Sequence, residues 1–171
     1  MRLFRRPERP PAEALTPLDR DERVVSWATA WGDGAVLATP LGLWLPAATE
    51  RLPWHLIDKA TWKESVLSVV PAVDGGDGVL TEQPARTVRL TVPRDLPQTV
   101  RVRVQKAIAF TRHHPLPGDG RRGVRVVGRR VPGRDGVSWQ LVFDPGVDVT
   151  DPLVRAAADG YVEQARAELG L

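Results

Sequence analysis

The 171-residue chain contains no cysteine, one methionine, three histidines and three lysines. Without cysteine it can form neither a disulfide framework nor a thiolate metal site, and nothing points to an oxidising compartment. No stretch approaches the roughly 20 uninterrupted apolar residues that span a bilayer, and no apolar run of signal-peptide length follows the basic start. We therefore expect a cytoplasmic protein without a transmembrane segment.

Catalytic and cofactor signatures are also missing. The sequence has no Ser-His-Asp arrangement with a nucleophile elbow, no phosphate-binding glycine loop, no HExxH motif and no dinucleotide fingerprint. The adjacent His113 and His114 lack further nearby ligands for a metal ion. We expect a protein that is not an enzyme and holds no metal or cofactor. The one catalytic arrangement left open pairs His55 with Asp58 or Glu64.

The composition predicts a folded core and one unusual end. Hydrophobic residues make up 42% of the chain, enough for one domain of ordinary size or a domain with a small appendage. Residues 1–20 hold four prolines among charges, which predicts a disordered, basic and proline-rich tail. Within this tail, Leu3 and Phe4 lie between arginines, so contact with an anionic membrane surface is an alternative.

Short apolar segments between Val36 and Val70 give the clearest strand pattern. The segment Thr39-Pro40-Leu41-Gly42 separates two apolar runs as a tight turn does, because proline fixes φ and glycine accepts positive φ. After this turn Leu43 and Leu45 alternate with Trp44, the apolar residues of 52–56 share one parity, and residues 65–70 form another apolar run. Such spacing predicts an antiparallel meander.

Two flanking segments extend the meander. Residues 23–30 are rich in β-branched and aromatic side chains, and the turn at residues 32–34 leads from them into the next strand. Residues 87–92 alternate and form the expected last strand. We expect the glycine-rich residues 71–84 to be a mobile loop.

A resemblance rests on these same residues. An apolar strand, Ala-Thr, a turn, Gly-Leu-Trp-Leu, a short loop and Leu-Pro-Trp within residues 36–57 resemble the first half of bacterial PH-like (GRAM-like) domains. The chain is also similar to a group of uncharacterised proteins of high-GC Gram-positive bacteria (actinobacteria), through Arg-Arg-Gly-Val-Arg-Val-Val at residues 121–127 and the Asp-Pro helix start at residue 151. The resemblances cover most of residues 20–170. They imply a PH-like barrel closed by a helix and supply no assigned activity.

We expect a helix to begin at Asp95. Asp95 has the character of a cap, Pro97 suits the first turn, and Gln98 stands where a capping box requires it. Residues 100–104 alternate perfectly, so a strand is the competing interpretation. The helix is favoured by the cap signals and by the continuation to Phe110, and the resemblance implies a closing helix at the same place.

The last third of the chain predicts a hairpin and a helix. Residues 122–131 and 137–143 are the clearest strands in the sequence, and a loop joins them. Asp151-Pro152 starts a final helix with an apolar stripe up to Gly170. We expect this unit to pack against the helix that begins at Asp95, because about fifty residues bury little core alone.

The expected fold class is therefore α+β. A tail over residues 1–20 precedes a PH-like antiparallel β-barrel or sandwich over residues 21–112, closed by a helix. Residues 113–171 form an appended β-hairpin and C-terminal helix.

Charge is unevenly distributed along the chain. Residues 93–143 hold eleven basic and three acidic side chains. Arginine outnumbers lysine 21 to 3, a bias that fits a GC-rich genome, so a high pI alone does not indicate nucleic-acid binding. Six arginines on or beside one hairpin, residues 121–134, form a predicted basic patch: Arg121, Arg122, Arg125, Arg129, Arg130 and Arg134. Two tryptophans, Trp31 and Trp62, are candidate aromatic contacts.

We expect a small, non-enzymatic binding or adaptor module that recognises a protein partner. The alternative is binding of nucleic acid or an anionic lipid surface through the basic hairpin, since such patches attract phosphates. Nucleic acid is disfavoured because the hairpin lacks interleaved exposed aromatic residues for base stacking. In a third interpretation the patch only balances the acidic C-terminal helix. Neither the partner nor an oligomeric state follows from the sequence.

Overall fold

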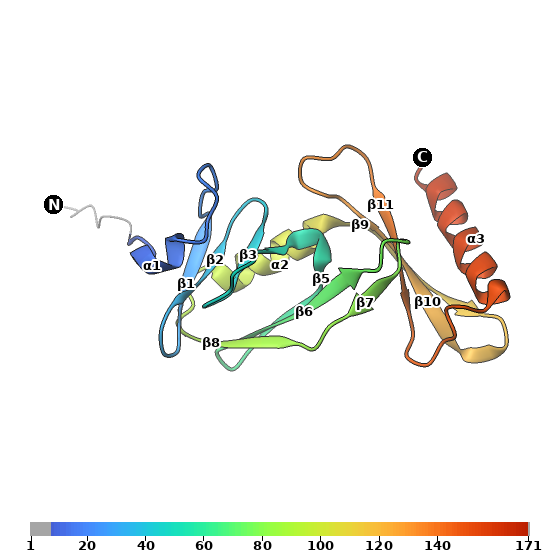
Figure 1. Cartoon of the computed structure of the whole chain (residues 1–171), viewed down its shortest axis with the longest axis horizontal. Helices are drawn as coiled ribbons and strands as arrows, with labels where there is room; N and C mark the ends of the chain where they lie inside the picture. The colour runs from blue at the N-terminus through green and yellow to red at the C-terminus, as the bar shows by residue number, and fades with distance from the viewer. Residues whose placement is uncertain (1–7, 171) are drawn as a thin grey trace.

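The computed structural model describes residues 8–170, apart from the side chains of residues 119 and 120. Its larger sheet is antiparallel and curls into a half-barrel (Figure 1). The strand order is β4 (Leu52–Pro53), β3 (Gly42–Trp44), β2 (Ala35–Ala38), β1 (Ser26–Ala30), β8 (Arg86–Val92), β6 (Val66–Asp74) and β5 (Ile57–Lys63). The short strand β7 (Leu80–Glu82) pairs with β6 outside this order. The α+β class and the antiparallel sheet are confirmed. The meander holds for β1 to β4, whereas β8, expected as its last strand, lies between β1 and β6.

Helix α2 (Leu96–Ala107) fills the hollow of the half-barrel. Its core residues recur at helical spacing and pack on inward-facing strand residues; they are Leu96, Val100, Val104 and Ala107. The predicted helix is confirmed and the strand alternative over residues 100–104 is wrong. The predicted cap is also wrong, because the Asp95 carboxylate instead accepts a hydrogen bond from Ser26 Oγ at 2.7 Å.

The outer face of β2 and β3 is covered by residues 8–22, which we call the N-terminal strap. It includes the short helix α1 (Ala12–Leu15). Ala14 and Leu18 of the strap pack on a cluster formed by Leu37 and Trp44. The described part of the predicted tail is therefore ordered, because an apolar face of the sheet needs cover. Residues 1–7, with Leu3 and Phe4, lie outside the described residues.

Two segments of the larger sheet differ from expectation. The strand predicted over residues 52–56 is only the two-residue β4, followed by the 3-10 helix η1 (Trp54–Leu56). The predicted mobile loop over residues 71–84 is largely a hairpin, since β6 continues to Asp74 and β7 pairs with it. Burial explains this pairing, because Ala72 and Leu80 pack against the second sheet.

The second sheet has three antiparallel strands in the order β11 (Ser138–Phe143), β10 (Asp119–Arg129) and β9 (Ile108–Leu116). The predicted hairpin of β10 and β11 is confirmed. Strand β9 was not predicted: α2 ends at Ala107, and the chain continues as a strand along the free edge of β10. Phe110 on this strand packs edge-on against Trp139 of β11, with ring centroids 5.6 Å apart.

Helix α3 (Pro152–Glu168) packs on the second sheet. Its predicted start is confirmed, since Asp151 accepts a hydrogen bond from Leu153 N at 2.8 Å. Its buried Val154, Ala158 and Ala165 join a core with strand residues of β10 and β11. In the hairpin and helix unit, Val127 and Val142 pack on Ala72 and Leu80 of the larger sheet, and the unit meets α2 where Arg130 N donates to the carbonyl of Ala107 at 2.8 Å.

The two sheets lie end to end, with the strap at one end of the molecule and α3 at the other (Figure 1). They meet where β7 runs beside β11, and Leu141 N donates to the carbonyl of Gly78 at 2.8 Å. None of the helices within residues 8–170 combines the length and apolarity that a bilayer crossing requires.

Candidate functional site

The hairpin arginines do not form one exposed patch. Arg125 and Arg129 lie on the face of β10 that is turned toward the larger sheet, and both reach Asp58 of β5, at 2.9 and 3.1 Å. Arg125 also pairs with Glu82 of β7 at 2.9 Å. Arg129 is 0% exposed and donates a further hydrogen bond to the carbonyl of Ile57. Arg129 is therefore part of the junction between the sheets and is closed to an external partner.

Burial governs the electrostatics of this junction. Loss of water lowers the pKa of Arg129, and the carboxylate of Asp58 opposes that shift. Burial, together with the neighbouring Asp58, raises the pKa of Glu82, and Arg125 offsets part of the rise. Two carboxylates and two guanidinium groups thus compensate one another where the sheets meet, as buried charges require.

The remaining four arginines of the predicted patch are divided between the two ends of β10. Arg122 donates to the carbonyl of Gly146 at 2.8 Å, and Arg121 lies beside it on the surface. Arg130 and Arg134 are exposed at the other end, in the loop that leads to β11. Seven strand residues lie between Arg122 and Arg130, a span of about 25–30 Å. The structure does not bring the six arginines together.

The histidines are not placed for the chemistry left open by the sequence. Asp58 is engaged by arginines, and Glu64 pairs with Lys63 on an exposed turn. His55 Nδ1 is buried without a hydrogen-bond partner among residues 8–170. Burial, then the charges of Arg129 and Arg134, lower the pKa of His55. Neither carboxylate is bonded to the imidazole.

His113 and His114 lie in β9 and not at a helix end. His113 Nε2 is 2.9 Å from Asp144 Oδ2, a contact that lowers the pKa of this carboxyl. The ring of His114 stacks on Tyr161 of α3 with centroids 4.1 Å apart. Both histidines therefore help to hold the loop after β11 and α3 onto the second sheet. Within residues 8–170 no group of three potential ligand side chains is close enough to hold a metal ion.

The two candidate tryptophans lie on different surfaces. Trp31 follows β1 and is 71% exposed, as the sequence predicts, with the Arg89 guanidinium 5.8 Å from its ring centre. Trp62 of β5 is 38% exposed and stands at the rim of a groove. Each lies beside a hollow of about 510 Å³: the one at Trp31 is bordered by Arg86 and Arg89 of β8, and the one at Trp62 lies between a strand and α2.

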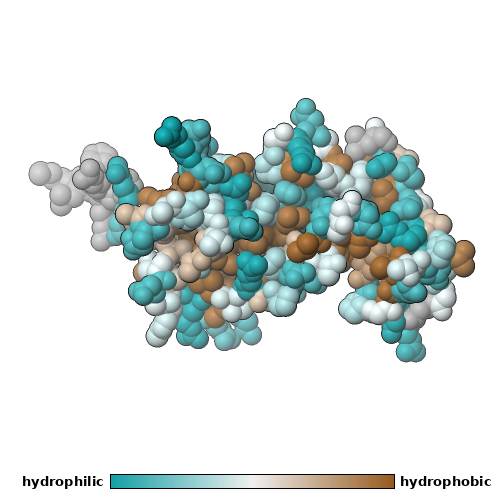
Figure 2. Space-filling view, in the orientation of Figure 1, coloured by the Kyte–Doolittle hydropathy of each residue, from teal (hydrophilic) through white to brown (hydrophobic). Residues whose placement is uncertain are grey.

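This groove lies between β5 and α2 and has a volume of about 510 Å³. Its apolar lining comes from both elements and from β6: Ala60, Leu67, Val100 and Val104. Three polar side chains of α2, Gln98, Arg101 and Gln105, border it at a spacing that places them on one face of the helix. In the space-filling view, apolar atoms reach the surface across the middle of the molecule amid a mainly hydrophilic periphery (Figure 2).

The main-chain N–H and C=O groups of the odd-numbered residues of β6 point away from β5. The carbonyl of Ser65, in the turn before β6, accepts from Leu90 N at 2.8 Å, and the carbonyl of Pro71 accepts from Gln83 N at 2.7 Å. Main-chain groups alternate in direction along an antiparallel strand. The even-numbered residues of β6 therefore bond to β5.

The pairing of β5 with β6 shows which main-chain groups of β5 are left without a neighbouring strand. Lys59, Thr61 and Lys63 are the residues of β5 opposite Val70, Ser68 and Val66. The main-chain groups of Ala60 and Trp62 accordingly point the other way, where β5 has no neighbouring strand within the described part of the sheet. Both residues also line the groove. The groove is thus bordered by unpaired main-chain donors and acceptors.

The charged side chains that line the groove, Arg94 and Arg101, are both basic. Arg94 lies where α2 begins, pairs with Glu8 of the strap and stacks over Trp27 at 4.1 Å. Helix α2 also carries Arg103 and Lys106 and has no acidic residue. These bases belong to the eleven basic residues of segment 93–143. The groove cannot be read from the sequence, because the meeting of β5 and α2 depends on distant parts of the chain.

Comparisons of this chain with protein-family models, with curated proteins and with solved structures found no match. The candidate site is therefore defined by its own geometry: an open strand edge, an apolar floor, an aromatic rim and a basic helix face.

Proposed function

We propose that this protein is a small, cytoplasmic, non-enzymatic binding module that takes an extended segment of a protein partner into the groove between β5 and α2. The observation that carries the proposal is the open main-chain edge of Ala60 and Trp62 beside an apolar groove. An extended peptide that adds to such an edge gains main-chain hydrogen bonds, and its alternate side chains enter the groove.

The dimensions of the groove suit a peptide strand. A strand added to β5 would lie about 4.8 Å from it and place every second side chain toward Leu67 and Val104. Trp62 would cover one of these side chains, in the role that large aromatic residues commonly have at interfaces. Arg94 is paired with Glu8, so Arg101 is the groove arginine that favours a partner segment with acidic residues, since complementary charges select partners and speed association.

We also propose that the larger sheet and α2, within residues 21–112, form a PH-like domain. Support comes from the curled antiparallel sheet and from the helix that fills its hollow. The second sheet with α3 is then an appendage fixed to this domain by the Arg129 and Asp58 ion pair. The appendage leaves the groove open, because it joins at β5, β6 and β7 on the junction side.

The experiment is affinity capture from a lysate of the source cells, with and without nuclease, using three forms of the protein. The groove variant is Trp62→Ala with Arg101→Gln, and the matched control is Arg130→Gln with Arg134→Gln. A protein retained in stoichiometric amount despite nuclease, lost with the groove variant and kept with the control, supports the proposal.

Two other outcomes would favour the alternatives. Nucleic acid recovered alone, and lost only with the Arg130→Gln and Arg134→Gln protein, would assign the function to the basic hairpin. Sedimentation with anionic liposomes, lost with the same hairpin variant, would indicate a lipid surface. Either result, with no change in the groove variant, would contradict the proposed groove.

A further inference from the structure

A second cavity, with a volume of about 770 Å³, lies on the outer face of the larger sheet, away from the groove. Its floor is formed by Ala35 and Leu37 of β2 and by Trp44 of β3. Strap residues form one wall and the loop after β3 forms the other: Ala14 and Pro17, and Leu45, Pro46, Ala47 and Ala48. This volume lies within the range of about 300–1,000 Å³ of small-molecule sites.

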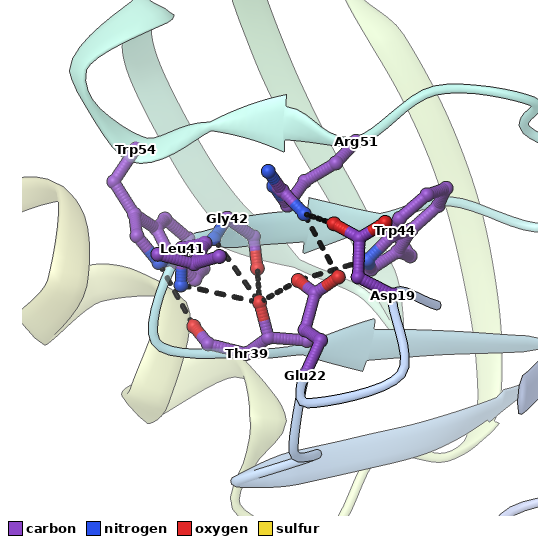
Figure 3. Close-up of polar contacts among 8 residues, drawn as sticks. All are labelled: Asp19, Glu22, Thr39, Leu41, Gly42, Trp44, Arg51 and Trp54. Atoms are coloured by element: carbon purple, nitrogen blue, oxygen red, sulfur yellow. Dashed lines mark hydrogen bonds and ion pairs between the residues drawn. The ribbon is translucent and has the colours of Figure 1, made fainter. Parts of the chain in front are cut away.

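The wall formed by the strap is fixed in place by a buried carboxylate (Figure 3). The side chain of Glu22 is 1% exposed and accepts hydrogen bonds from Thr39 Oγ, from Trp44 Nε1 at 3.3 Å and from Arg51 Nη1 at 2.8 Å. Arg51 also pairs with Asp19 of the strap. The same bonds orient the Trp44 ring, so the cavity has a preformed aromatic floor.

The charged residues that line this cavity are both acidic. Glu13 lies on the strap and Asp33 on the turn between β1 and β2. Neither carboxylate has a hydrogen-bond or ion-pair partner within residues 8–170, whereas nearby Arg51 is engaged by Glu22 and Asp19. The cavity therefore combines an apolar interior with two carboxylates at its rim that no ion pair within residues 8–170 engages.

We propose that this cavity binds a small apolar cation, a molecule with a hydrophobic body and a protonated amine. The body packs on Leu37 and Trp44, where burial of apolar surface drives binding. The amine remains at the rim beside Glu13 and Asp33. This site is independent of the groove, because its lining shares no residue with it.

The two carboxylates are not equivalent. Asp33 also borders a neighbouring hollow that is lined by Arg86 and Arg89. Those guanidinium groups offset part of its charge, whereas the lining around Glu13 contains no base. Loss of the Glu13 charge therefore weakens amine binding more than loss of the Asp33 charge does.

The probes are three molecules with one tail and different heads: decylammonium, decanol and decanoate, each below its micelle-forming concentration. Isothermal titration of the full chain is expected to give tightest binding for decylammonium, weaker binding for decanol and no binding for decanoate. An exposed ion pair contributes up to about fivefold in affinity, and the two factors multiply, so two carboxylates set a preference of up to about 25-fold for the amine over the alcohol.

Three variants separate charge from shape. Glu13→Gln with Asp33→Asn is expected to abolish the preference for decylammonium and to leave decanol binding unchanged. Ala14→Trp fills the cavity and is expected to remove binding of both; if this variant does not fold by circular dichroism, Ala48→Trp on the opposite wall replaces it. Arg130→Gln on the distant hairpin is the control and is expected to bind as the unaltered protein does.

The proposal is overturned if decanoate binds as tightly as decylammonium or if the unaltered protein binds none of the probes. It is also overturned if the double carboxylate variant keeps the amine preference, or if a folded tryptophan variant binds normally.

Discussion

Arg129 of β10 and Asp58 of β5 form an ion pair across the junction of the two sheets, with Arg129 Nη2 3.1 Å from Asp58 Oδ1. Arg129 has no exposed surface, and the Asp58 side chain is 7% exposed. Between the same two sheets, Val127 of β10 packs in a cluster with Leu80 of β7. The two sheets are therefore joined by a buried charge pair that allows little change in their relative position.

Replacement of Asp58 is predicted to weaken the fold. In Asp58→Asn the buried guanidinium of Arg129 loses its countercharge, which costs about 3 kcal/mol in the free energy of unfolding. The matched change is Arg125→Gln, because Arg125 is partly exposed and its loss leaves the central pair intact. A cost of at most about 1 kcal/mol is expected there. Urea denaturation followed by tryptophan fluorescence measures both costs. Equal costs would show that the Arg129–Asp58 pair stabilises the fold no more than Arg125 does.

The fold is predicted to lose stability as pH falls below about 6.5. Burial lowers the pKa of His55 and of His114, so in acid the unfolded chain binds more protons than the folded chain does. Stability is present above the ordinary histidine pKa and decreases as pH falls through that value. Thermal unfolding at about pH 7.5 and about pH 5.5 measures the loss.

His55→Gln tests the origin of this pH dependence. The variant is expected to show a smaller decrease in melting temperature between the two pH values, because it lacks the His55 imidazole, which takes up a proton more readily in the unfolded chain. The raised pKa of Glu82 acts in the opposite direction, since protonation of that carboxyl favours the folded chain as pH falls through its raised pKa. An unchanged pH dependence in His55→Gln would assign the effect to other groups.

The N-terminal strap is predicted to depend on Glu22. Glu22→Gln weakens three hydrogen bonds and leaves Arg51 with only the exposed Asp19, a change that costs about 1–3 kcal/mol. The matched variant Asp19→Asn removes a largely exposed charge and is expected to cost less than about 1 kcal/mol. Limited proteolysis should cut within residues 8–22 faster in Glu22→Gln only. Equal cleavage rates in both variants would show that Glu22 does not hold the N-terminal strap in place.

The basic face of α2 is predicted to choose acidic segments. Arg101→Glu reverses the charge at the middle of the groove and should weaken binding of an acidic peptide about tenfold or more, with a reduced dependence on salt. Arg103→Glu on the same helix lies outside the groove lining and serves as the control. Fluorescence anisotropy of a labelled peptide measures both affinities. Equal weakening by the two variants would indicate general attraction without a site on the groove.

Elements whose sequence signals lie within a short stretch could be predicted from the sequence. Helix α3 and the hairpin of β10 and β11 were predicted, because a cap, an apolar stripe and alternating residues lie within short stretches. Helix α2 was predicted although its cap was not, since Asp95 bonds to Ser26, a residue 69 positions away. Strand β9 was missed, because its only signal is the free edge of β10.

The same reasoning explains the error over the arginine patch. Alternation along β10 places Arg125 and Arg129 on one face with Val127, and that much is readable from the sequence. Whether this face is exposed to water or covered by another sheet depends on how β7 and β5 pack on it. The sequence of the hairpin alone does not determine that packing. Trp62 was named from the sequence as a candidate aromatic contact, whereas the open edge beside it requires the register of β5 and β6.

The most direct test of the groove is amide hydrogen exchange at the open edge of β5. A random-peptide library is first selected on the immobilised protein, and the exchange of each amide is then measured with and without the enriched peptide. Binding along the edge of β5 should enrich acidic sequences and slow exchange at Ala60 and Trp62, with little change at Thr61, whose main-chain groups already face β6. Slower exchange elsewhere, with Ala60 and Trp62 unchanged, would rule out strand addition at this edge.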